Sequence, residues 1–176
     1  MTRYAYTILF GWWFGVIQSS YFFQLEIFLT AAYTGFITAT LAWIAGSIAG
    51  LYLARPANGS PPLIIWHAAG LAAYYTCLLS LAAFPYQLAL TPLYFILIMV
   101  SGGQTGHFFA YNQKTFPKAS TLFFMENNGF ILGWLVGFSG FVMAGVDFHY
   151  YFPLVAGTAL VPLALYHGKK MKGQKP

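Results

Sequence analysis

Charge and cysteine are both scarce in this chain. Only 6% of its 176 residues are charged, and one residue, Cys77, is a cysteine. Soluble domains carry about 25% charged residues, so this composition excludes an ordinary soluble domain. A single cysteine excludes a disulfide framework and a cysteine-based metal site. What the chain has in abundance is apolar surface, since 59% of its residues are hydrophobic and 20% are aromatic.

The basic residues do not indicate a nucleic-acid partner, although the net charge is +5. They are scattered singly along the chain and cluster only at its end, as Lys169, Lys170, Lys172 and Lys175. In a membrane protein this pattern reports topology. We expect residues 168–176 to form a basic cytoplasmic tail that contacts anionic membrane lipids.

Six apolar segments are long enough to cross a bilayer, which takes about 20 residues at 1.5 Å per residue. They cover residues 4–23, 27–53, 63–84, 88–110, 121–145 and 148–167. The first resembles a signal peptide in length. Its aromatic core and the sequence Gln18-Ser19-Ser20 do not suit a cleavage site, so we expect a helix there.

The connections between these segments alternate in charge. Arg3, Arg55, Lys114, Lys118 and the lysine tail fall on one side of the expected membrane, and the first, third and fifth loops contain no basic residue. The positive-inside rule makes the basic side cytoplasmic. The sequence therefore predicts an all-α, integral membrane six-helix bundle of a cell inner membrane, with N- and C-termini cytoplasmic.

Glycines recur at four-residue spacing in several of the expected helices. The pairs are Gly11/Gly15, Gly46/Gly50 and Gly133/Gly137, with Gly102, Gly103 and Gly106 in the expected fourth helix. This spacing lets helices approach closely in lipid, so we interpret these glycines as packing positions. The second and fifth segments share the pattern, which is a hint of a three-plus-three repeat.

A few polar residues interrupt the apolar segments on the basic side. They are His67, Gln104, His107, Glu126, Asn127 and Asn128. Ionisable groups inside a membrane are expensive, face the bundle interior and usually mark a site. His67, His107 and Glu126 each lie a few residues from a basic-side loop, about 6–8 Å inside the boundary at 1.5 Å per residue. We expect the six residues to line one pocket open to the cytoplasmic leaflet.

The chemistry of this pocket is open between several interpretations. A quinone head group would use His67 or His107 together with Glu126 as hydrogen-bond and proton partners. His67 and His107 as axial ligands of a b-type haem are a minor alternative, because no histidine pair shares one helix. Glu126 as the coupling group of a proton-coupled carrier is a third. The fourth is purely structural, with polar groups that only join helices.

The polar residues expected at the other side show no metal-ligand spacing, so we interpret them as a solvated rim or a docking face. They are Gln18, Gln24, Glu26, Gln87, Asp147 and His149.

Residues 123–133 read FFMENNGFILG. This run is similar to the aromatic-x-x-acid-x-x-Gly-x-x-x-Gly run in the membrane region of bacterial fused spermidine-synthase-like proteins. Residues 46–50, residues 102–106 and Phe116-Pro117 resemble other parts of the same region. The resemblance implies a six-helix bundle like half of a major-facilitator transporter. The family more often has Asp where this chain has Glu126, and its aminopropyl-transfer domain has no counterpart here, so no synthase activity is implied.

These observations predict an integral membrane subunit without catalytic activity of its own. We expect it to anchor a larger complex of membrane or periplasmic subunits, in a respiratory or electron-transfer assembly, and to contribute a quinone pocket near the cytoplasmic leaflet. The alternatives are a small proton-coupled carrier, acting as a dimer of six-helix halves, and a structural scaffold.

Overall fold

The computed structural model describes residues 3–54 and 63–172, and these form six α-helices and two short 3-10 helices. The elements are α1 (Arg3–Leu29), α2 (Ala32–Leu53), α3 (Leu63–Ala83), η2 (Leu88–Leu90), α4 (Thr91–Asn112), η3 (Gln113–Thr115), α5 (Ala119–Ala144) and α6 (Val146–Lys172). No strand occurs in this part of the chain, so the predicted all-α class is confirmed. The predicted loop around Arg55, the tail residues 173–176 and the side chains of Lys169, Lys170 and Lys172 lie outside the described residues.

Five helices, α2 to α6, are long and apolar enough to cross a membrane, which makes the chain a multi-pass membrane protein. The first helix is not among these five, and it carries the polar residues Thr7, Ser19, Ser20 and Gln24, all of them buried. α1 contacts all five other helices and supplies many of the largest buried side chains of the core. Its polar groups are therefore enclosed by protein.

Two predicted loops on the side without basic residues prove to be helical. α1 continues through Gln24, Leu25 and Glu26, because Leu25 is buried and neither Gly nor Pro interrupts the segment. Only residues 30 and 31 separate α1 from α2. At the other hairpin Gly145, with φ of 59°, alone joins α5 to α6. A left-handed φ is readily available to glycine, so α6 can begin at once.

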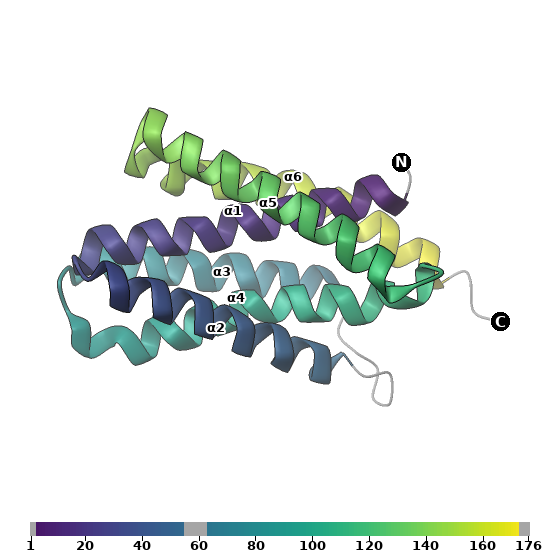
Figure 1. Cartoon of the computed structure of the whole chain (residues 1–176), viewed down its shortest axis with the longest axis horizontal. Helices are drawn as coiled ribbons and strands as arrows, with labels where there is room; N and C mark the ends of the chain where they lie inside the picture. Colours follow the sequence, from purple (N-terminus) through teal and green to yellow (C-terminus); the bar gives the residue numbers. More distant parts are fainter. Residues whose placement is uncertain (1–2, 55–62, 173–176) are drawn as a thin grey trace.

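The helices lie in two layers of three (Figure 1). One layer holds α5, α1 and α6, and the other holds α2, α4 and α3. α1 packs most closely on α5, and α2 most closely on α4, whereas α5 barely touches α4. α1 begins and α6 ends at the same end of the bundle. We call this the basic end, since Arg3, Lys114 and Lys118 also lie there.

Glycines let α1 and α5 cross in direct backbone contact. A Cβ atom at any of four positions would run into a carbonyl oxygen of the other helix: Gly11 into Glu126, Gly15 into Phe130, Gly129 into Ile8 and Gly133 into Trp12. Close backbone approach of this kind is how helices gain packing energy in lipid. The α1–α5 pair therefore depends on small residues on both helices.

The crossing of α2 and α4 is built in the same way. The four clashes are Gly46 with the carbonyl oxygen of Met99, Gly50 with that of Gly103, Gly102 with that of Trp43 and Gly106 with that of Ser47. Seven of the glycines predicted to be packing positions thus occupy the two crossings, whereas Gly103 and Gly137 lie against the side chains of Trp66 and Ser19.

The two crossings correspond contact by contact. The contact of Gly102 with Trp43 corresponds to that of Gly11 with Glu126, and the contact of Gly106 with Ser47 to that of Gly15 with Phe130. Likewise Gly46 with Met99 corresponds to Gly129 with Ile8, and Gly50 with Gly103 to Gly133 with Trp12, so the spacing in sequence is the same in both sets. α1 and α4 run in opposite directions, as do α2 and α5 (Figure 1). The exchange of α1 with α4 and of α5 with α2 therefore approximates a two-fold rotation about an axis across the bundle. We call residues related in this way counterparts.

Candidate functional site

A chain of side-chain hydrogen bonds joins four helices near the centre of the bundle. The Trp13 indole N–H donates to the Gln104 side-chain oxygen over 3.3 Å. The Gln104 amide nitrogen donates to His67 Nδ1 over 2.6 Å. His67 Nε2 lies 2.9 Å from the carbonyl oxygen of Gly157. These residues come from α1, α4, α3 and α6 and are buried, and we call them the central chain.

The partners of His67 decide its protonation. The Gly157 carbonyl can only accept, so His67 Nε2 carries the proton, and Nδ1 accepts from the Gln104 amide. Both ring nitrogens of this neutral imidazole are thus engaged within the protein. In this arrangement His67 has no nitrogen left to ligate a haem iron.

His107 lies in a different place. It is fully buried between aromatic rings, with its centroid 5.5 Å from Trp66 and 6.1 Å from the stacked ring of Tyr111. His67 bonds to Gln104, which stands about one helical turn before His107 on α4, so the two imidazoles meet different neighbours.

Glu126 lines a groove between α2, α4 and α5 of about 350 Å³. Its side chain is only 8% exposed. The other lining residues are Ser47, Ile48, Leu51, Thr105, Gly106, Phe109 and Phe123. Within the described part of the chain no hydrogen bond or ion pair satisfies the Glu126 carboxyl group. A carboxyl group held in an apolar groove without a partner is costly, and ionisable groups in such places usually mark a functional site.

The internal two-fold shows how the side chains of this groove differ from those at the corresponding place in the other half. Ser47, Thr105 and Glu126 have as counterparts Phe130, Phe14 and Trp43. Phe14 is fully buried and Trp43 nearly so. At the basic end the small or polar residues Thr105 and Glu126 stand in place of these rings. The contacts of the two helix crossings match between the halves, whereas the side chains of the groove differ from their counterparts.

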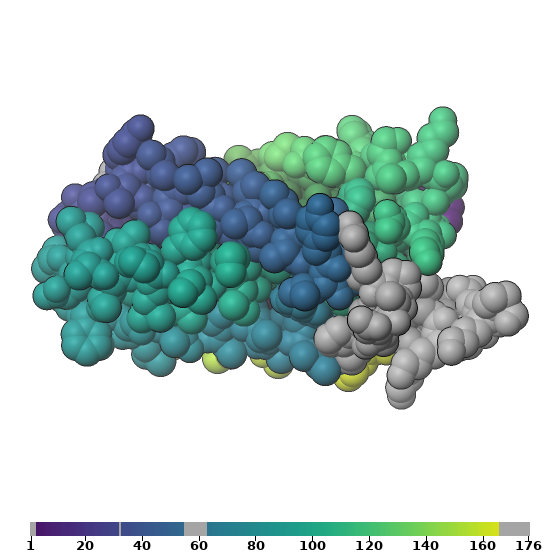
Figure 2. All heavy atoms as spheres, turned by 90° about the horizontal axis from the view of Figure 1, so that it is seen from below, coloured from purple at the N-terminus to yellow at the C-terminus, as the bar shows by residue number. Residues whose placement is uncertain are grey.

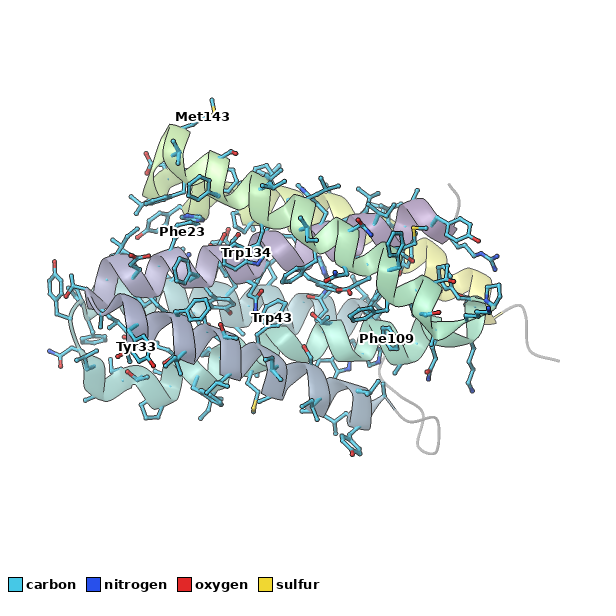
Figure 3. All side chains as sticks on the ribbon, in the orientation of Figure 1. Phe23, Tyr33, Trp43, Phe109, Trp134 and Met143 are labelled. Atoms are coloured by element: carbon cyan, nitrogen blue, oxygen red, sulfur yellow. The ribbon has the colours of Figure 1, made fainter. Side chains whose placement is uncertain are left out.

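The groove opens on the outside of the bundle. Ile48, Leu51 and Phe123 are each substantially exposed. On the space-filling view the blue spheres of α2 and the green spheres of α5 adjoin on this face (Figure 2). Phe109 lies where α4 passes between these two helices (Figure 3). In a membrane this opening would face lipid.

The remaining predicted residues do not reach the groove. Asn127 and Asn128 are exposed, and the Asn128 amide donates to the carbonyl oxygen of Phe124 over 2.7 Å. The structure therefore divides the six predicted residues: His67 and Gln104 in the central chain, His107 among aromatic rings, Glu126 in the groove, and the two asparagines at the surface.

The sequence did not predict a buried polar cluster that lies at the end opposite the basic end. Gln24 donates to the Tyr74 hydroxyl over 2.6 Å, and that hydroxyl donates to the carbonyl oxygen of His149 over 2.7 Å. His149 Nδ1 lies 2.9 Å from the Ser20 hydroxyl. Gln24 and His149 were expected in a solvated rim but are fully buried. The four-residue spacing of Ser20 and Gln24, which puts both on one helix face, was the available signal.

The groove offers few polar contacts to a ligand. The Ser47 hydroxyl donates to the carbonyl oxygen of Trp43 over 2.9 Å, so it is already bonded to the backbone. The Thr105 hydroxyl is buried and has no partner among the described residues. Phe109 and Phe123 form an aromatic wall, with ring centroids 6.5 Å apart. The site suits a flat, mostly apolar molecule with a hydrogen-bond donor for Glu126.

Among the described residues no group of three or more His, Cys, Asp or Glu side chains is placed to hold a metal ion. No protein-family model, curated protein or solved structure matches this chain.

Proposed function

We propose that this chain is an integral membrane subunit that anchors an electron-transfer complex and binds a quinol head group at Glu126. The observation that carries the proposal is the Glu126 side chain, which is only 8% exposed, lines a groove open to lipid and has no hydrogen-bond partner among the described residues. A quinol has hydroxyl groups that donate hydrogen bonds and a flat ring. One hydroxyl would donate to Glu126, and the ring would lie against Phe109 and Phe123.

The proposed topology puts this groove in the cytoplasmic leaflet of the inner membrane. All six helices cross the membrane, and α1 crosses inside a shell formed by the others. Arg3, Lys114 and Lys118 mark the cytoplasmic end, and Glu26 and Asp147 lie toward the opposite end. Glu126 is seven residues from the start of α5, about 10 Å at 1.5 Å per residue.

The anchoring role is supported by the surface and by the central chain. Large apolar side chains are exposed along α2, α5 and α6, a surface suited to lipid and to other membrane subunits. The central chain joins four helices by hydrogen bonds between polar groups that lipid tails could not satisfy. These bonds stabilise the bundle to which partner subunits would attach.

A second candidate is a proton-coupled carrier that works as a dimer of six-helix halves, and the internal two-fold favours it. Inverted repeats related by an axis in the membrane plane are common in secondary transporters. In this alternative Glu126 takes up and releases the coupling proton. Solute flux by the chain alone, in proteoliposomes, distinguishes a carrier from an anchor.

Co-purification tests the quinol proposal. The chain is purified in mild detergent, its lipid extract is analysed by mass spectrometry, and Glu126→Gln is compared with Glu26→Gln. Glu26 is an acidic residue near the end of α1 opposite the basic end and does not line the groove, which makes it a matched control. We expect quinone or quinol with the unmodified chain and with Glu26→Gln, and loss with Glu126→Gln. Equal amounts in all three proteins would reject the site.

A further inference from the structure

The face of α5 that carries Glu126 continues as an apolar furrow toward the opposite end of the bundle. Beyond Glu126, Phe130, Trp134 and Phe138 follow at four-residue spacing. These three, with Ile131 and Leu135, line a furrow of about 470 Å³. Side chains at this spacing lie on one face of a helix. The groove and the furrow therefore follow one another along α5.

Polar groups free to bind a ligand occur only at the Glu126 end of this path. In the furrow the Trp134 indole N–H already donates to the Gln18 side-chain oxygen over 3.1 Å. The rest of the furrow lining is apolar. The path thus matches a molecule with one polar head and a long apolar tail.

From these features we infer that the ligand of the groove is a single-tailed amphiphile whose tail lies along α5 from Glu126 to Phe138. This inference rests on the proposed function and adds the position of the tail. The distance from residue 126 to residue 138 is about 18 Å at 1.5 Å per residue, enough for a tail of about a dozen carbon atoms. In the other direction α5 begins after about 10 Å, too short for such a tail.

Two neighbouring residues of α5 offer a matched pair of substitutions. Ile131 and Leu132 are 51% and 50% exposed. Ile131 lines the furrow on the Glu126 side, and Leu132 lines a separate hollow with Trp12 and Phe148. A tryptophan at residue 131 would block the tail path, whereas one at residue 132 would not. Both changes place a large ring on an already exposed surface, so neither disturbs the core.

The test uses the full chain in lipid nanodiscs and two probes, a benzoquinol ring without a tail and the same ring with a decyl tail. We expect the decyl compound to bind more tightly. Ile131→Trp should weaken its binding about tenfold, the value for roughly two lost methylene contacts. The tailless ring should be unaffected by Ile131→Trp, and Leu132→Trp should change neither Kd.

The outcomes separate the two proposals. If both probes bind and need Glu126, but Ile131→Trp and Leu132→Trp act alike on the decyl compound, the tail does not lie in the furrow and the head-group site stands. If Glu126→Gln leaves the binding of both probes unchanged, the head-group site is wrong, and the tail position is wrong with it.

Discussion

Trp13 of α1 and Gln104 of α4 are counterparts, and the indole N–H of one donates to the amide oxygen of the other over 3.3 Å. Residues exchanged by a two-fold rotation meet only where the axis passes. This bond therefore marks the centre of the internal symmetry. It is also where symmetry is broken, because Gln104 goes on to bind His67.

Removal of Gln104 should weaken the bundle. Gln104→Leu leaves the Trp13 indole and His67 without their partner, so two buried groups lose hydrogen bonds. Interhelical hydrogen bonds in membranes contribute about 0.6–1.7 kcal/mol each, so we expect a loss of about 1–3 kcal/mol. The free energy of unfolding can be measured by denaturant titration in detergent micelles. Gln113→Leu, at an exposed residue of η3, should have no effect. Equal stability of both variants would show that the central chain contributes nothing.

The two helix crossings should respond alike to substitution. Gly11→Ile and Gly102→Ile are counterpart changes, and each puts a side chain against a carbonyl oxygen of the crossing helix. We expect each to lower the free energy of unfolding by about 1–3 kcal/mol, the usual range for overpacking. Ala72→Ile, on the exposed surface of α3, serves as the control. A large loss of unfolding free energy from one of the two glycine substitutions and none from the other would contradict the claim that the two crossings are equivalent.

The groove should be filled when Thr105 is replaced by phenylalanine, the residue at its counterpart position 14. Thr105→Phe introduces the side chain found at residue 14, and we expect it to abolish binding of a tailless benzoquinol. Thr105→Val keeps the size of the side chain and should retain most of the affinity. Isothermal titration of the protein in nanodiscs measures both. Full binding by Thr105→Phe would place the ligand elsewhere.

Much of the fold could be predicted from composition and spacing, since long apolar segments and glycine pairs are local signals. The registers of α1 on α5 and of α2 on α4 could not, because they depend on contacts between segments far apart in sequence. The candidate site was harder to predict from the sequence than the fold. His67 and Glu126 stand at similar expected depths, yet a depth does not tell which side of a helix a residue occupies. Gln24 and His149 were placed in a rim because polar residues near a segment end resemble a loop, whereas tertiary hydrogen bonds satisfy them inside the bundle.

The membrane orientation can be tested by cysteine labelling with a membrane-impermeant maleimide. The natural Cys77 is fully buried, so the unmodified chain should react little. Gln87→Cys and Lys114→Cys place a thiol at exposed positions of opposite ends. We expect Gln87→Cys to react in intact cells and Lys114→Cys only after lysis. The reverse pattern would invert the proposed topology.

The most direct measurement of the central claim observes the Glu126 carboxyl group itself. Infrared difference spectra are recorded as decyl benzoquinol is added to the chain in nanodiscs. We predict a change in a carboxyl band with the unmodified chain and with Glu26→Gln, and its absence with Glu126→Gln. An unchanged carboxyl region on ligand addition, or the same change in Glu126→Gln, would contradict the claim that Glu126 binds the head group.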